Sequence, residues 1–111
     1  MASHEDGMLM VQLARWGTEL GLDDALRIVL AEHYEPAQAM FDEKHVQTIV
    51  QFGETVATLT KNGALDEGLV LDWLWVSGMW NRVGPAAIGQ REKLGVPELF
   101  ENFEALAAKQ P

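Results

Sequence analysis

The amino-acid sequence predicts an all-α fold, a compact bundle of four to five helices, and two observations carry this prediction. Apolar residues recur at intervals of three and four along most of the chain, which is the spacing of one helix face. No stretch sustains the alternation of apolar and polar residues that is typical of a half-buried strand. The expected connections are short, which favours antiparallel helices packed side by side.

The first predicted helix runs from about residue 3 to residue 20. Gly21 can end it in a left-handed conformation. We expect residues 1–7 to be frayed or disordered, because Gly7 weakens the start of the helix. Met8 is an alternative to Met1 as the first residue of the protein. The apolar face of this helix consists of Leu9, Leu13, Trp16 and Leu20.

Two further helices are predicted before residue 63. Asp23–Asp24 places negative charge at the start of a short helix over about residues 23–33, where exposed N–H groups favour it. Residues 34–36 are predicted to form a joint, because proline disfavours helix in the residue before it. A longer helix then begins at residue 37 or 42 and ends at Asn62.

The central helix of the bundle is predicted over residues 66 to about 94. It is apolar on nearly every side, which is typical of a helix that is buried or contacts a partner. We expect a kink or a division near Pro85, since proline removes one helical hydrogen bond and clashes with the preceding turn. A last helix begins at Pro97, and its apolar face consists of Leu99, Phe100, Phe103, Leu106 and Ala107.

Composition predicts one domain over residues 1–111 and excludes several classes of function. Seventeen acidic against eight basic residues give a net charge of −9, which would repel nucleic acid. The absence of cysteine excludes disulfides and fits a cytoplasmic protein. The sequence shows no secretory signal and no apolar run long enough to span a membrane, so we expect no membrane insertion.

The second half of the sequence carries a spaced series of residues: Gly63, Leu65-Asp66, Trp80, Pro85, Arg91 and Asn102-Phe103-Glu104. With this series, the segment over about residues 55–106 resembles a bacterial family that is known as a domain of unknown function. The resemblance implies a small helical protein and no particular activity. Many members of that family carry an N-terminal membrane segment, and this sequence shows none.

The sequence predicts no catalytic, metal or cofactor site. His4, His33 and His45 are the candidates for acid–base or metal chemistry near neutral pH. Asp42 lies three residues before His45, but a two-metal bundle site needs a second such pair and further carboxylates from facing helices. Neither serine lies in a nucleophile elbow, and no glycine-rich loop follows a strand. A role other than catalysis is therefore favoured.

Four tryptophans are the most unusual feature of the sequence. We expect Trp16, Trp73 and Trp80 to contribute to an aromatic core. Trp75 lies about 200° from Trp73 around a helix, so the two rings cannot both face the same small core. The candidate interface or ligand surface consists of Trp73, Trp75, Trp80, Arg82 and Arg91.

Two functions are compatible with this surface. The first is a non-enzymatic protein–protein interaction module, a homodimer or a partner of another protein, whose interface includes part of the aromatic set. The alternative is a small-molecule or peptide binder with a tryptophan-lined cavity, in which Arg82 or Arg91 orients an anionic group. Such arginines more often pair with acidic residues of neighbouring helices.

Overall fold

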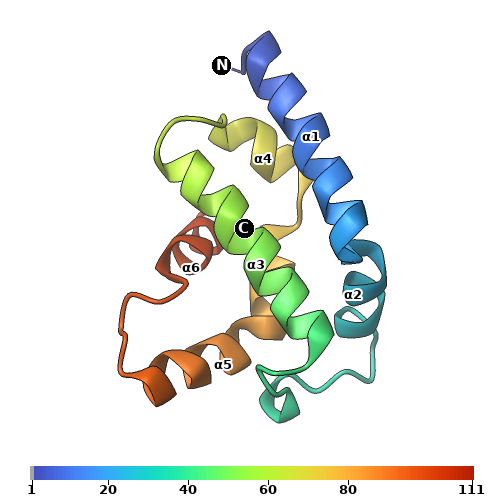
Figure 1. The fold of residues 1–111 in the computed structure, drawn as a ribbon, viewed down its shortest axis with the longest axis vertical. Helices are drawn as coiled ribbons and strands as arrows, with labels where there is room; N and C mark the ends of the chain where they lie inside the picture. The colour runs from blue at the N-terminus through green and yellow to red at the C-terminus, as the bar shows by residue number, and fades with distance from the viewer. Residues whose placement is uncertain (1) are drawn as a thin grey trace.

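The computed structural model describes residues 2–111, which form six α-helices and one short 3-10 helix and contain no strand (Figure 1). The predicted all-α class is therefore confirmed, whereas the predicted four to five helices are one or two fewer than the six α-helices observed. The elements are α1 (His4–Leu20), α2 (Leu22–Val29), η1 (Pro36–Gln38), α3 (Lys44–Lys61), α4 (Glu67–Trp73), α5 (Val76–Leu94) and α6 (Glu101–Ala108).

Helix α3 is the axis of the fold. It crosses the molecule with α1 and α2 along one side and with α5 and α6 along the other (Figure 1), and α2, α5 and α6 all pack directly on it. The apolar residues that recur along α3 at helical spacing are mostly buried against these neighbours. Its fully buried side chains are Val46, Ile49, Val50, Phe52 and Val56.

Aromatic rings fill the space above glycines of the helices. The ring of Phe103, from α6, lies directly on Gly53 of α3, where an added Cβ would collide with three of its carbon atoms. Trp80, from α5, meets Phe103 edge-on with ring centroids 5.0 Å apart and itself lies against Gly84. Helix α6 can therefore approach α3 closely because residue 53 has no side chain, whereas Gly84 leaves room for the Trp80 ring within α5 itself.

The central helix that the sequence predicts is divided, but a division at Pro85 is contradicted. Helix α5 continues through Pro85, and the chain breaks instead at Leu74 and Trp75, where Leu74 is extended. The physical reason is burial: Val70 and Val76 are both buried, and the break turns α5 so that Val76, Met79 and Val83 face the core. Pro85 leaves the Asn81 carbonyl without its helical hydrogen-bond donor. Both residues are exposed, so water can take the place of that donor and the helix tolerates the proline.

The start of α1 is closed by a capping box. The Asp6 backbone N–H donates to the Ser3 hydroxyl at 3.1 Å, and the Asp6 carboxylate accepts from the Ser3 backbone N–H at 2.7 Å. The same carboxylate accepts from the backbone N–H of Asp66, just before α4, at 3.1 Å. Residues 4–7, for which we expected fraying, are thus helical, while Met1 lies outside the described residues. Among residues 2–111, none of the helices combines the length and the hydropathy of a membrane span.

A methyl group at residue 53 would separate α3 from α6. We expect Gly53→Ala to lower the free energy of unfolding by about 1–3 kcal/mol, because Phe103 must move. Gly89→Ala is the matched control, since Gly89 lies inside α5 with open space around it, and it should raise stability by up to about 1 kcal/mol through helix propensity. Urea unfolding of both variants measures the difference. Equal effects of the two substitutions would contradict the assigned contact.

The Asp6 carboxylate makes stability depend on pH. Hydrogen bonds from the Ser3 backbone and hydroxyl, and from the Asp66 backbone, hold the pKa of Asp6 below its ordinary value of 3.8. Because the folded pKa is depressed, this stabilisation is fully present above the unfolded pKa and is lost as pH falls through the folded pKa. Asp6→Asn should therefore be less stable than the native chain at pH 7, and this difference should shrink by pH 3. Urea unfolding at both pH values tests this, and an undiminished difference at pH 3 would refute it.

Candidate interaction surface

The break between α4 and α5 exposes one tryptophan. Trp75 is the residue that precedes α5, and 61% of its surface is accessible to solvent. Its ring lies over Gly78, so close that a Cβ added to Gly78 would collide with carbons of the indole. A largely apolar side chain with one N–H donor thus lies at the surface with one face of its ring against the backbone of α5.

The side chain of Gln110 bonds to backbone groups that the break leaves without helical partners. Its side-chain N–H donates to the carbonyls of Leu71 at 3.1 Å and Leu74 at 2.9 Å. Its side-chain oxygen accepts from the backbone N–H of Ser77 at 2.8 Å. The segment after α6 therefore caps the end of α4 and the start of α5 with a single amide.

The other two candidate tryptophans contribute to the core instead. Trp73 meets Phe52 edge-on, with ring centroids 6.1 Å apart, and Trp80 packs on Phe103. Both are partly buried and contact the main apolar cluster. Of the three, Trp75 alone has more than half of its surface exposed.

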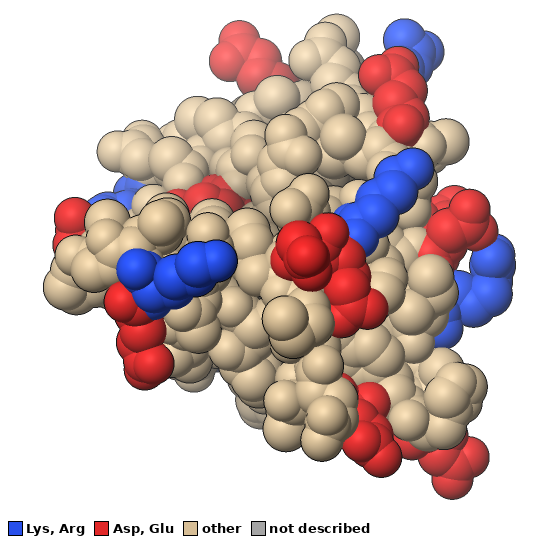
Figure 2. Space-filling view, turned by 60° about the horizontal axis from the view of Figure 1, so that its bottom comes forward, with Lys and Arg blue, Asp and Glu red and all other residues tan. Residues whose placement is uncertain are grey.

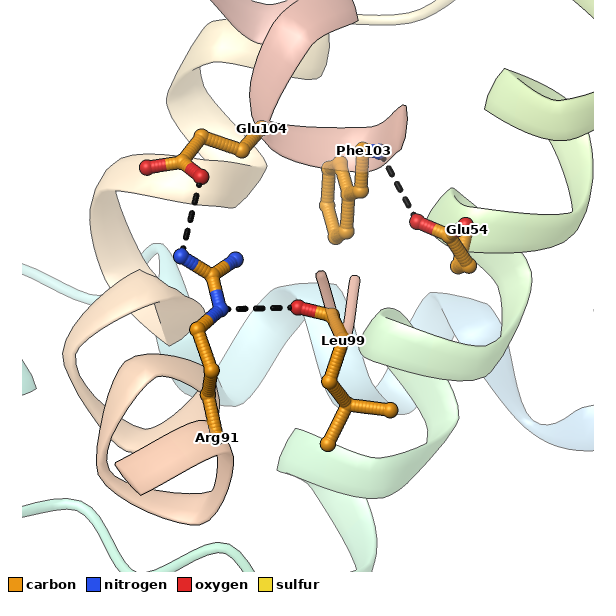
Figure 3. A network of polar contacts seen from close by, with 5 residues as sticks. All are labelled: Glu54, Arg91, Leu99, Phe103 and Glu104. Carbon is orange, nitrogen blue, oxygen red and sulfur yellow. Dashed lines mark hydrogen bonds and ion pairs between the residues drawn. The ribbon is translucent and has the colours of Figure 1, made fainter. Parts of the chain in front are cut away.

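The two candidate arginines hold irregular segments in place. Arg82 donates from Nη1 to the carbonyl of Tyr34 at 3.3 Å, which joins α5 to the segment before η1. Arg91 donates from Nε to the carbonyl of Leu99 at 2.9 Å and pairs with Glu104 through Nη1 at 3.1 Å (Figure 3). These contacts give both side chains structural partners within the chain.

The Arg91 network continues across the bundle. The buried Nη2 of Arg91 has no hydrogen-bond partner among the described residues and lies on the side of Phe103 (Figure 3). On the far side of that ring, the Glu54 carboxylate of α3 accepts from the backbone N–H of Phe103 at 2.9 Å. Polar contacts thus fix the start of α6 from both neighbouring helices.

Charge on the lower end of the molecule is mixed. Figure 2 shows the lysine and arginine side chains of this face scattered singly among acidic ones rather than gathered into one patch. A field of this kind gives no extended platform for a polyanion.

The titratable groups near η1 are partly buried and are not grouped into a metal site. Burial raises the pKa of Tyr34, the nearby Glu43 carboxylate adds to the rise, and the Arg82 guanidinium opposes it. The Nε2 atom of His45 is buried 3.3 Å from a Glu43 carboxylate oxygen without a hydrogen bond. Within residues 2–111, no three histidine or acidic side chains are grouped so that they could hold a metal ion.

Sequence reasoning missed two features of the surface. Gln110 gave no local signal, because its partners are more than thirty residues away along the chain. Met8 and Val11 are 54% and 61% exposed on the outer side of α1. They could have been found, since they lie opposite the face that contains Leu9 and Leu13.

Comparison with known proteins identifies the family. A protein-family model described as a domain of unknown function (DUF4760) matches residues 15–110, and the chain belongs to that family. The resemblance seen in the second half of the sequence is confirmed, and the match extends it into α1. No curated protein and no solved structure matches the chain.

Loss of the Arg91 guanidinium should loosen the loop before α6. We expect Arg91→Ala to lower the free energy of unfolding by about 1.5–3 kcal/mol, because hydrogen bonds to a charged donor are lost. Lys93→Ala is the control, since Lys93 is exposed on the same turn of α5, and it should change stability by no more than about 0.5 kcal/mol. Urea unfolding compares the two. If Arg91→Ala is as mild as Lys93→Ala, the network does not anchor α6.

Proposed function

We propose that this member of the DUF4760 family is a non-enzymatic protein–protein interaction module that forms a homodimer through a surface centred on Trp75. The observation that carries the proposal is the placement of Trp75, which is 61% exposed while Trp73 and Trp80 pack on core phenylalanines. Tryptophan is enriched among the few residues that dominate binding energy at interfaces.

The fixed ring favours binding energetically. Association costs side-chain entropy for each rotamer that becomes immobilised. The ring of Trp75 already rests on Gly78, so part of the ordering that binding requires is present in the free chain. Covering it removes a large apolar surface from water at a small entropic cost.

A second copy of the chain is the partner that the proposal chooses. Isologous dimers are the commonest assemblies, and a two-fold axis beside Trp75 would let each copy cover the other's ring. A standard interface buries about 800 Å² on each partner. Trp75 supplies only part of this area, so we place Leu74 and the exposed side of α4 at the rim. The cysteine-free chain fits a reducing compartment, and we propose the cytoplasm as its location.

The ligand-binding alternative has less support. A tryptophan-lined cavity requires open space beside the rings, whereas Trp73 and Trp80 are in contact with Phe52 and Phe103. The surface hollow between α3 and α6 has a volume of about 500 Å³, and its lining includes Ala57, Asn102 and Leu106 but no tryptophan.

A charge at residue 75 should separate the dimer. We expect light scattering over a range of concentrations to give twice the 12.3 kDa chain mass for the native protein and the chain mass for Trp75→Glu. The variant should remain folded, because the ring lies outside the core.

Met40→Glu is the matched control for this experiment. Met40 is 62% exposed and lies beside Pro85 and Lys93, away from the start of α5. The Met40→Glu substitution introduces the same charge at an equally accessible apolar residue and should leave the dimer intact. A native protein that is monomeric at every concentration, or a Trp75→Glu variant that stays dimeric, refutes the proposal.

A further inference from the structure

One side chain bonds to the backbone on both sides of Trp75. Leu74 and Ser77 bracket the tryptophan, and both are bonded to the Gln110 amide at 2.9 and 2.8 Å. In an unbroken helix these groups would pair with neighbours one turn away. Helix bonds still hold the junction through the Leu74 N–H on Val70 and the Met79 N–H on Trp75. The Leu74 carbonyl and the Ser77 N–H have no such neighbours, and Gln110 supplies their bonds.

Glutamine is suited to this place because it is both donor and acceptor. The two carbonyls of Leu71 and Leu74 need a donor, and the Ser77 N–H needs an acceptor. A carboxylate offers only acceptors and an ammonium group only donors. The side chain also has the length to reach α4 and α5 from the end of α6.

The neighbouring residue ties down the other end of α4. Lys109 pairs with Glu67, in the first turn of α4, at 2.9 Å. This pair is largely exposed, with side-chain exposures of 59% and 45%, so its contribution is small. Gln110 is partly buried and makes three hydrogen bonds, and it is the stronger of the two attachments.

We infer that Gln110 is a positioning residue for the Trp75 surface, through which the segment after α6 controls self-association. The inference rests on the proposed function. With Gln110 docked, residues 74–77 are fixed and the ring stays over Gly78. With Gln110 released, the Leu71 and Leu74 carbonyls and the Ser77 N–H turn to water, and the junction that carries the ring becomes looser.

The coupling is reciprocal. If docking of Gln110 strengthens the dimer, dimer formation must strengthen the docking of Gln110 by the same factor. Anything that captures the segment after α6, such as a second protein that binds it, would therefore weaken the dimer without touching Trp75.

The experiment compares Gln110→Met, which keeps the length of the side chain but removes all three bonds, with the native chain. We expect the dimer dissociation constant from light scattering to rise about tenfold or more, since each mobile residue must be ordered again on binding. Gln110→Glu should weaken the dimer at least as much, because its carboxylate faces two carbonyl oxygens. Lys109→Met is the matched control and should change the constant no more than about twofold.

Two further readouts separate this role from a general loss of stability. Backbone hydrogen exchange at residues 75–78 should accelerate in Gln110→Met, while exchange in α3 stays at the native rate. The side-chain amide of Gln110 should exchange more slowly in the dimer than in Trp75→Glu. An unchanged dissociation constant in Gln110→Met overturns the inference. If the native chain is monomeric the proposed function fails, and native exchange rates at residues 75–78 in Gln110→Met then overturn the positioning role as well.

Discussion

The contact of Phe103 with Gly53 is the constraint on which the rest of the structure depends. Helix α6 can approach α3 only because residue 53 has no side chain, and the ring of Phe103 fills that space. The next residue of α3, Glu54, accepts from the backbone N–H of Phe103, so adjacent residues supply the apolar and the polar part of one anchor. A buried N–H with no partner would oppose the same approach. The position of α6 then decides where the segment after it can reach.

From this anchor, polar side chains hold the irregular parts of the chain in turn. Arg91 fixes the loop before α6 through Leu99, Arg82 fixes the segment before η1 through Tyr34, and Gln110 closes the break before α5. Each donates to a backbone carbonyl that no helix satisfies. A small helical domain has little apolar surface with which to hold its loops. Charged and amide donors that reach across the bundle can hold them through hydrogen bonds to backbone carbonyls instead.

Local patterns were sufficient to predict most helices but not the break. The face of α1 and its end at Gly21 follow from spacing and from a residue that accepts a left-handed conformation, and α3 ends within one residue of its predicted end. Nothing near Leu74 signals an interruption, because the cause is the burial of both Val70 and Val76 together with a distant glutamine. Pro85, the obvious local signal, causes no interruption because it faces water. For the candidate site, the angle argument for Trp73 and Trp75 assumed one continuous helix, and the two residues lie instead on either side of the break. The backbone partners of Arg82 and Arg91 required the fold.

Under the proposed function, the exposure of Trp75 has a use and is more than a by-product of the break. If residue 75 only joined α4 to α5, a polar side chain would serve there and avoid an exposed apolar surface. Residue 78 could then be alanine, which favours helix over glycine by about 1 kcal/mol. The chain instead has tryptophan at 75 and glycine at 78, and the Trp75 ring occupies the place that a side chain at 78 would take. Glycine at residue 78 thus lowers helix propensity and makes room for an exposed ring. That arrangement is favourable in free energy only if a partner covers the ring and removes its apolar surface from water.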